Sequence, residues 1–248
     1  MTRSNKNLNF YTVNEIEGSL LMCESVVGVG YGELVKIMTQ DGEEKTGQVI
    51  DVSDNIVVIQ MFEKTSGLNV KSLGIRFTGE TIKIPVSMDM LGRTFSGVGK
   101  PIDNGPNIIP EDFLDVHAGT INPYSRAHPT KVIQTGISVI DGLNTLLLGQ
   151  KLPLLSGSGM PHKRLASQIV SQAKVPGSDD EFTIVFAAMG ITSDEMVLFR
   201  DDFLKMGAIG RVVMFINLAE DPAIERLLTP AFALTTAEYL AFQHDHHV

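Results

Sequence analysis

The sequence has one cysteine, Cys23, and no tryptophan among its 248 residues. A single cysteine cannot form an internal disulfide, and it has no CxxC partner that would bind zinc. This cysteine usage fits a reducing compartment such as the cytoplasm. We interpret Cys23 as a small buried apolar residue, because that role is commoner than a reactive thiol.

Basic residues are also scarce. The 20 Lys and Arg residues stand against 29 Asp and Glu residues, which gives a formal net charge of -9 at pH 7. Proteins that coat nucleic acid cluster Lys and Arg against the phosphates. The acidic balance therefore argues against nucleic acid as a partner.

Long apolar runs are missing as well. No stretch of the sequence approaches the roughly 20 apolar residues that a membrane helix needs. Residues 1–9 are polar and contain no apolar core of a secretory signal. We therefore expect a cytoplasmic protein without direct membrane insertion, whose connection to any membrane runs through partners.

Residues 32–86 contain closely spaced short strands and no helical period between them, so residues 1–86 are interpreted as one domain. Turns are expected at Asp41-Gly42 and Asp54-Asn55. The expected strands cover residues 33–39, 45–51, 56–62, 75–78 and 81–86. Such short strands expose their edges unless the sheet closes. The pattern therefore predicts a small closed antiparallel β-barrel.

The remaining chain divides into two parts. Residues 87–134 are rich in Gly and Pro and are interpreted as a linker. In residues 135–248, apolar runs alternate with helical patterns, which predicts an α/β domain with a parallel sheet. The expected strands cover residues 152–155, 182–189 and 211–218, and capping-box pairs that mark helix starts are Thr192/Glu195 and Thr235/Glu238.

Parallel sheets bind ligands at the carboxyl ends of their strands. We therefore expect function in the loops that follow Leu155 and Met189.

Several motifs in this order resemble the subunits of rotary ATPases. They are Leu91-Gly92-Arg93, Gly99-Lys100-Pro101-Ile102-Asp103, residues 135–143, residues 185–190 and residues 234–239. Residues 156–162 and 217–222 are most similar to the B-type subunits of V-type (archaeal and bacterial) ATPases and ATP synthases. Each motif alone is weak, but together they are specific, and the resemblance extends from about Leu8 to the end. It implies a β-barrel followed by a P-loop (RecA-like) domain that is truncated, with the family's C-terminal helical domain absent.

An active phosphate loop has the pattern GxxxxGK[ST], in which backbone N–H groups and the lysine hold phosphates and the hydroxyl binds Mg²⁺. Aligned with it, Ser156 replaces the first glycine, Pro161 the second, His162 the lysine and Lys163 the hydroxyl. Proline has no N–H, histidine is shorter and mostly neutral, and a lysine repels Mg²⁺. Weak or no nucleotide binding is therefore expected at the degenerate loop, which comprises Ser156, Gly157, Ser158, Gly159, Met160, Pro161, His162 and Lys163. A weak anion site at His162 and Lys163 is the less favoured alternative.

The next strand end has also lost a catalytic group. Catalytic members of the family carry Gly-Glu-Arg there, and this chain has Gly190-Ile191-Thr192. An isoleucine cannot polarise the attacking water. We therefore expect no catalytic residues and no ATP hydrolysis by the family mechanism.

The resemblance implies a regulatory and structural role. B-type subunits alternate with catalytic A subunits in a hexameric ring and couple ATP turnover to ion transport across the membrane. The implied partners are the A subunits, the central stalk and the peripheral stalk, in a complex peripheral to the membrane. No cofactor of its own is implied, and ATP or ADP is expected only at interfaces with the catalytic subunit. The family's arginine finger and Walker B aspartate belong to segments beyond Val248.

Two rival functions fit the residues less well. An active nucleotide-hydrolysing subunit or a related export ATPase would need the lost GK[ST] and the strand-end glutamate. A nucleic-acid motor of the transcription-terminator type would need stacking aromatics and basic residues on its barrel.

The terminal cluster His244, Asp245, His246 and His247 is interpreted as solvated or structural, so no metal site is expected. A chain whose parallel sheet lacks later strands is also expected to aggregate and to assemble poorly on its own.

Overall fold

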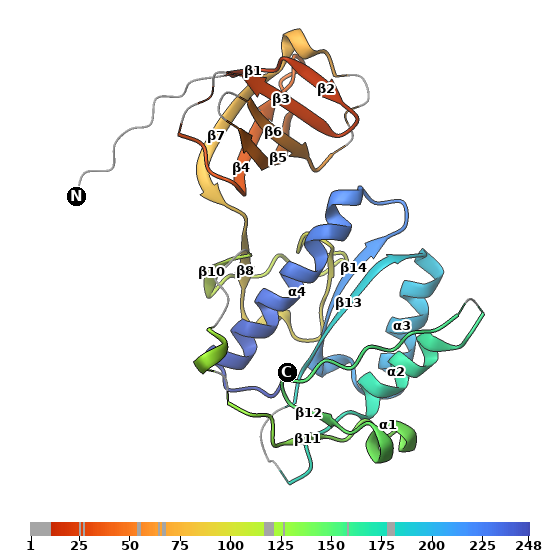
Figure 1. Ribbon diagram of the computed structural model, residues 1–248. Coiled ribbons are helices and arrows are strands. Elements are labelled where there is room, and N and C mark those ends of the chain that lie inside the picture. Colours follow the sequence, from red (N-terminus) through yellow and green to blue (C-terminus); the bar gives the residue numbers. More distant parts are fainter. Residues whose placement is uncertain are drawn as a thin grey trace. The chain divides into compact units, whose positions relative to one another are not determined.

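The computed structural model describes residues 11–24, 26, 28–53, 56–63, 65, 68–116, 122–125, 127–157, 159–177 and 182–248. The turn predicted at Asp54-Asn55 lies outside the described residues. The chain forms two compact units. The first comprises the described residues of Met1–Lys83, Asp115–His117 and Asp221–Leu227, and the second those of Ile84–Leu114, Ala118–Glu220 and Leu228–Val248. Each unit is described separately below (Figure 1).

The first unit contains an antiparallel sheet of seven strands in the order β1-β7-β4-β5-β6-β3-β2. The strands are β1 (Tyr11–Thr12), β2 (Glu15–Glu17), β3 (Leu20–Glu24), β4 (Glu33–Met38), β5 (Glu44–Ser53), β6 (Ile56–Met61) and β7 (Gly74–Thr81), with a short 3-10 helix η1 (Val70–Ser72) before β7. The sheet curls on itself, and β1 approaches β3 across the closure (Figure 1). This arrangement confirms the predicted small antiparallel barrel. The pattern does not predict β1, β2 and β3, and the strand expected at residues 81–86 instead forms β8 (Lys83–Val86) outside this sheet.

Alternation along the strands builds the barrel core. Val35 and Ile37 in β4 are fully buried, while their neighbours Lys36 and Met38 are half-buried. Cys23 is buried among the same apolar residues, as the sequence predicts, and burial raises the pKa of its thiol to about 11. At Gly47, a Cβ would lie 2.9 Å from the carbonyl oxygen of Gln60, so only glycine allows β5 and β6 to approach this closely.

The second unit contains a three-stranded parallel sheet in the order β13-β14-β9. Its strands are β13 (Ile184–Ile191), β14 (Val212–Leu218) and β9 (Thr94–Ser96). Two small pairs of strands accompany it, formed by β8 (Lys83–Val86) with β10 (Asp112–Asp115) and by β11 (Val132–Ile133) with β12 (Leu146–Leu147). The helices are α1 (Ser138–Leu143), α2 (His162–Gln172), α3 (Ser193–Lys205) and α4 (Ala223–Gln243), of which residues 223–227 belong to the first unit. The 3-10 helices are η2 (Met88–Met90), η3 (Pro123–Ser125) and η4 (Ile209–Arg211).

The parallel sheet confirms the predicted fold class, although its third strand comes from an unexpected place. β9 lies within the segment interpreted as a linker, and it pairs with residues 214–216 of β14. Phe95 is buried and stacks on Phe215, with ring centroids 5.5 Å apart. A three-residue strand among many Gly and Pro residues is too short to show an alternating pattern, so the sequence does not predict β9.

Two predicted elements do not form as the sequence suggests. Leu152–Leu155 is not a strand, and the side chain of Leu155 is 95% exposed. A run of four apolar residues becomes a strand only beside a partner that accepts its backbone hydrogen bonds, and no strand of the described residues lies alongside it. The helix start at Thr235 is also wrong, because α4 continues through this residue and the Thr235 hydroxyl donates to the carbonyl of Ala231 at 2.9 Å.

The helix after β13 follows the sequence prediction closely. Thr192 caps α3, and both hydrogen bonds of the capping box with Glu195 are present. Phe199 and Phe203 of α3 pack with Phe186 of β13 in one aromatic cluster. Gly207, with φ of 68°, follows the end of the helix. Among the described helices, none combines the length and apolarity needed to span a membrane.

Candidate functional site

The candidate site lies where β13 and β14 end. The backbone N–H of Gly190 donates to Oδ1 of Asn217 at 3.2 Å, and the N–H of Ala219 donates to the carbonyl of Ile191 at 2.8 Å. These bonds tie the two carboxyl ends together. A cavity of about 220 Å³ opens there, lined by Ile191, Thr192, Ser193, Leu218, Ala219 and Glu220. Parallel sheets place their ligand sites at such strand ends.

Ile191 is the residue that the resemblance places where catalytic members of the family carry a glutamate. Its side chain is half-buried and packs against the apolar core of the second unit. An aliphatic side chain neither accepts a hydrogen bond nor takes up a proton. The strand end therefore offers no general base at this position.

The degenerate phosphate loop forms a turn before α2. Ser156 and Gly157 are exposed without regular structure, Gly159 has φ of 82°, and Met160 is 61% exposed. Ser158, the remaining residue predicted for this loop before Pro161, lies outside the described residues. The loop keeps the turn geometry expected from its glycines.

Two backbone donors of this loop, the N–H groups of Met160 and His162, are used within the loop itself. The N–H of Met160 donates to the carbonyl of Gly157 at 3.3 Å, and the N–H of His162 donates to the carbonyl of Met160 at 2.9 Å. Pro161 has no N–H, and it makes no side-chain cap for α2. Nδ1 of the His162 ring lies 3.0 Å from the same Met160 carbonyl. At Met160, Pro161 and His162 a phosphate would therefore find no available N–H group of the kind that an active phosphate loop presents.

Lys163, at the position of the metal-binding hydroxyl, forms an ion pair with Glu195 of α3. Nζ of Lys163 donates to Oε1 of Glu195, while Oε2 of Glu195 accepts the backbone N–H of Thr192 at 3.0 Å. The bond from Lys163 lowers the pKa of Glu195 most, followed by the bond from the Thr192 N–H. Lys163 thus already has an anionic partner inside the chain.

Two residues of this site are not evident from the sequence. The local pattern identifies Glu195 only as part of the capping box, and its contact with Lys163 joins segments 32 positions apart. Asn217 belongs to the B-type motif in the sequence, and the fold buries it fully at the end of β14. A lone amide at the end of a continuous apolar strand is the signal that singles it out.

Two other family motifs form structural anchors away from the loop. Nη2 of Arg93 donates to Oδ1 of Asp103 and to the carbonyl of Pro106, both at 2.9 Å. The Arg93 guanidinium holds the pKa of Asp103 well below its usual range, and Asp103 also accepts the N–H of Thr94 at the start of β9. A Cβ at Gly105 would overlap the Arg93 guanidinium. This motif therefore fixes β9 and does not contribute to the candidate site.

The segment before α1 is held in a similar way by Asp141. Its carboxylate accepts the N–H and the hydroxyl of Thr135 at 2.9 and 2.7 Å, and the N–H of Gly136 at 3.0 Å. The hydroxyl of Thr135 makes the largest contribution to lowering the pKa of Asp141. Gly136 has φ of 77°, and a Cβ there would overlap the side chain of Gln172. The turn is a structural feature that the motif specifies.

The terminal histidine cluster lies at the end of α4. His244 contacts Glu111 at 3.7 Å, and the same carboxylate accepts the hydroxyl of Tyr239 at 2.7 Å. The rings of His244 and His246 are 6.4 Å apart. Within the described parts of the chain, no three His, Cys, Asp or Glu side chains gather as metal ligands would.

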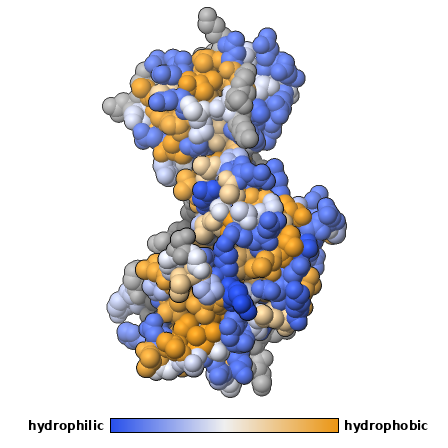
Figure 2. Space-filling model, turned by 90° about the vertical axis from the view of Figure 1, so that its right-hand side faces the viewer, coloured by the Kyte–Doolittle hydropathy of each residue, from blue (hydrophilic) through white to orange (hydrophobic). Residues whose placement is uncertain are grey.

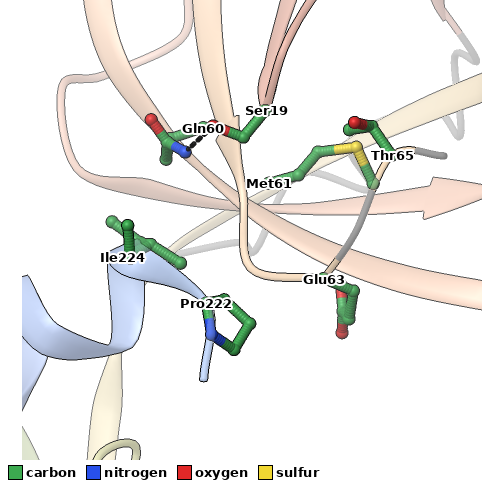
Figure 3. A pocket seen from close by; sticks show the side chains of 8 residues that line it. Ser19, Gln60, Met61, Glu63, Thr65, Pro222 and Ile224 are labelled. Atoms are coloured by element: carbon green, nitrogen blue, oxygen red, sulfur yellow. Dashed lines mark hydrogen bonds between the residues drawn. The ribbon is translucent and has the colours of Figure 1, made fainter. Parts of the chain in front are cut away.

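A separate cavity of about 400 Å³ occurs in the first unit (Figure 3). Its lining residues are Ser19, Gln60, Met61, Glu63, Thr65, Pro222, Ala223 and Ile224. Nε2 of Gln60 donates to the hydroxyl of Ser19 at 2.6 Å, and Oε2 of Glu63 accepts the N–H of Thr46 at 3.0 Å. Because these polar groups bond within the unit, we assign the cavity no ligand.

Comparisons with known proteins connect both units to one family. Residues 13–79 match the β-barrel domain of the ATP synthase alpha/beta family, and residues 136–248 match its nucleotide-binding domain. The B subunit of the A-type ATP synthase of Methanopyrus kandleri (strain AV19) is 54% identical over 239 residues, which cover 96% of this chain and 24% of that protein. The chain therefore spans about a quarter of the length of this curated relative.

Proposed function

The chain belongs to the ATP synthase alpha/beta family, and from this premise we propose that it is an N-terminal portion of a non-catalytic B subunit of a V-type rotary ATPase. In this role it alternates with catalytic A subunits in a ring and transmits conformational change between ATP turnover and ion transport. The central and peripheral stalks are its further partners. It reaches the membrane only through the assembled complex.

The internal bonding of the degenerate loop carries the non-catalytic part of this proposal. Met160 and His162 use their N–H groups within the loop, Pro161 has none, and Lys163 is paired with Glu195. Phosphoryl transfer depends on positioned donors and a metal ion around the phosphates. With these groups engaged, the described residues of the loop present fewer donors than an active phosphate loop, and Ile191 supplies no base at the strand end.

The role needs no cofactor of its own. ATP or ADP is bound at interfaces with the catalytic subunit, where that subunit supplies a working phosphate loop. The degenerate loop contributes a turn and a packed helix to the fold.

The proposal is tested by mixing the chain with the catalytic A subunit from the same organism and measuring complex formation by native mass spectrometry, together with ATP hydrolysis. We expect no hydrolysis by the chain alone, and a complex with the A subunit when mixing is done below the concentration at which the chain self-associates. Hydrolysis by the chain alone would contradict the non-catalytic assignment. Failure of the chain to bind the A subunit would contradict its assignment as a ring subunit.

A further inference from the structure

The N-terminus of α2 is electrostatically unfavourable as the sequence stands. Its first turn contains Lys163 and Arg164 and no acidic residue, and its N-cap, Pro161, forms no side-chain cap. A helix N-terminus carries partial positive charge, so basic residues there oppose the helix dipole. The helix nevertheless begins at His162. A negative charge from another element would offset the unfavourable charge of this turn.

Glu195 lies in position to supply that charge. One oxygen of its carboxylate accepts from Nζ of Lys163, and the other accepts the N–H of Thr192 at 3.0 Å. Glu195 is also in the first turn of α3, where a carboxylate is favourable on its own account. A single side chain therefore contacts the beginnings of two helices.

We propose that Glu195 is the N-terminal carboxylate of both helices: it caps α3 within its own turn and neutralises the uncapped basic turn of α2. The pair with Lys163 holds the degenerate loop against the end of β13 without any ligand. The positive charge of Lys163 is thereby paired with Glu195 of the same chain. This role concerns how the loop is held, so it stands independently of the proposed function.

The surroundings of the pair support this assignment. Side-chain exposure is 37% for Lys163 and 26% for Glu195, so solvent screens the pair only in part. The bond from Lys163 is the largest cause that lowers the pKa of Glu195. The negative charge is thus directed towards the first turn of α2.

Glu195→Gln tests the proposal, because glutamine keeps the capping box of α3 and removes only the charge. Asp194→Asn is the matched control: it removes one charge from the same turn, at an exposed residue next to Glu195. Amide hydrogen exchange of residues 164–167 is measured on the whole chain. We expect exchange of these residues to be about 3-fold faster in Glu195→Gln than in Asp194→Asn, whereas the first turn of α3 loses one charge in both variants and should respond equally.

A second comparison uses Lys163→Gln. If the pair acts as proposed, Glu195→Gln has little further effect in the Lys163→Gln background, because the charge that it balances is gone. Equal exchange in Glu195→Gln and Asp194→Asn would overturn the proposal, as would an undiminished effect of Glu195→Gln in the Lys163→Gln background. Faster exchange confined to α3 would also overturn it, because Glu195 would then cap only its own helix.

The unmodified chain gives an independent test, which does not depend on the folding of any variant. Raising NaCl from about 0.05 to about 0.5 M shortens the screening length several-fold. Exchange in the first turn of α2 should then rise about 2-fold, relative to the apolar interior of β14. No change with salt would contradict an electrostatic role for the pair.

Discussion

At the scale of single residues, charged side chains of the family motifs act mainly as anchors of the fold. Arg93 and Asp103 fix the start of β9, and Asp141 fixes the turn at Thr135 and Gly136. The order and spacing of the motifs identify these residues as a group. Their individual partners are not predictable in the same way, because Arg93 contacts Asp103 and the carbonyl of Pro106 through the folded loop between them.

The pair of Arg93 and Asp103 gives a pH dependence. The pKa of Asp103 is lower in the folded chain than in the unfolded chain, since Arg93 stabilises its charged form. The stabilisation is therefore fully present above the unfolded carboxyl pKa of about 4, and it is lost as pH falls through the lower folded value. Asp103→Asn should cost about 1–3 kcal/mol at pH 7 and less near pH 3, measured by urea unfolding. Asp41→Asn, in an exposed hairpin turn, is the control and should change stability little at either pH. An equal loss for Asp103→Asn at both pH values would contradict this account.

At the scale of elements, periodic patterns predict the strands and helix starts that depend on neighbouring residues in the sequence. The strands of the barrel follow their alternation, and α3 begins at its capping box. Leu152–Leu155 is not a strand because a strand forms only beside another strand that accepts its backbone hydrogen bonds. The local sequence does not show whether such a partner is present. Thr235 and Glu238 do not start a helix because the same spacing also occurs inside a helix, where the threonine hydroxyl bonds to a carbonyl four residues earlier.

The C-terminus of α2 depends on a residue from another element. The guanidinium of Arg211 donates to the carbonyl of Ser171 at 2.7 Å and to those of Val170 and Ala173 at 3.4 Å. A cation at a helix C-terminus satisfies the last carbonyls and favours the dipole. Arg211→Met should therefore destabilise the chain by about 1–2 kcal/mol and increase hydrogen exchange in the last turn of α2.

Arg200→Met is the matched control for this change. Arg200 is an exposed arginine of α3 that pairs only loosely with Asp201, at 3.7 Å. Surface pairs of this kind contribute about 0–1 kcal/mol. If both variants lost the same stability, Arg211 would have no special role at α2.

At the scale of the whole molecule, the sheet of the second unit is only partly covered. β13 is at one edge of the order β13-β14-β9, and Phe182 just before it makes a single parallel bridge to His247. An apolar groove of about 540 Å³ runs beside β13 and is lined mainly by residues of α2, β13 and α4. Apolar residues also gather in patches on the surface of the second unit (Figure 2).

An exposed edge strand beside apolar surface promotes association between chains. We therefore expect the 248-residue chain to self-associate at micromolar concentration, as measured by sedimentation velocity. Val185→Lys, which places a charge on β13 in the groove, should shift the chain towards monomer. Val197→Lys on the exposed side of α3 is the control and should leave association unchanged. A monodisperse unmodified chain with a cooperative melt would refute this expectation, and circular dichroism checks that both variants remain folded.

The central claim is that the phosphate loop of this chain no longer performs nucleotide chemistry. Calorimetric titration of the chain with Mg·ATP tests it most directly, because binding must precede any turnover. The account predicts no saturable binding stronger than about 1 mM, corresponding to less than about 4 kcal/mol of binding free energy. Micromolar binding that depends on Mg²⁺, followed by release of phosphate, would contradict it.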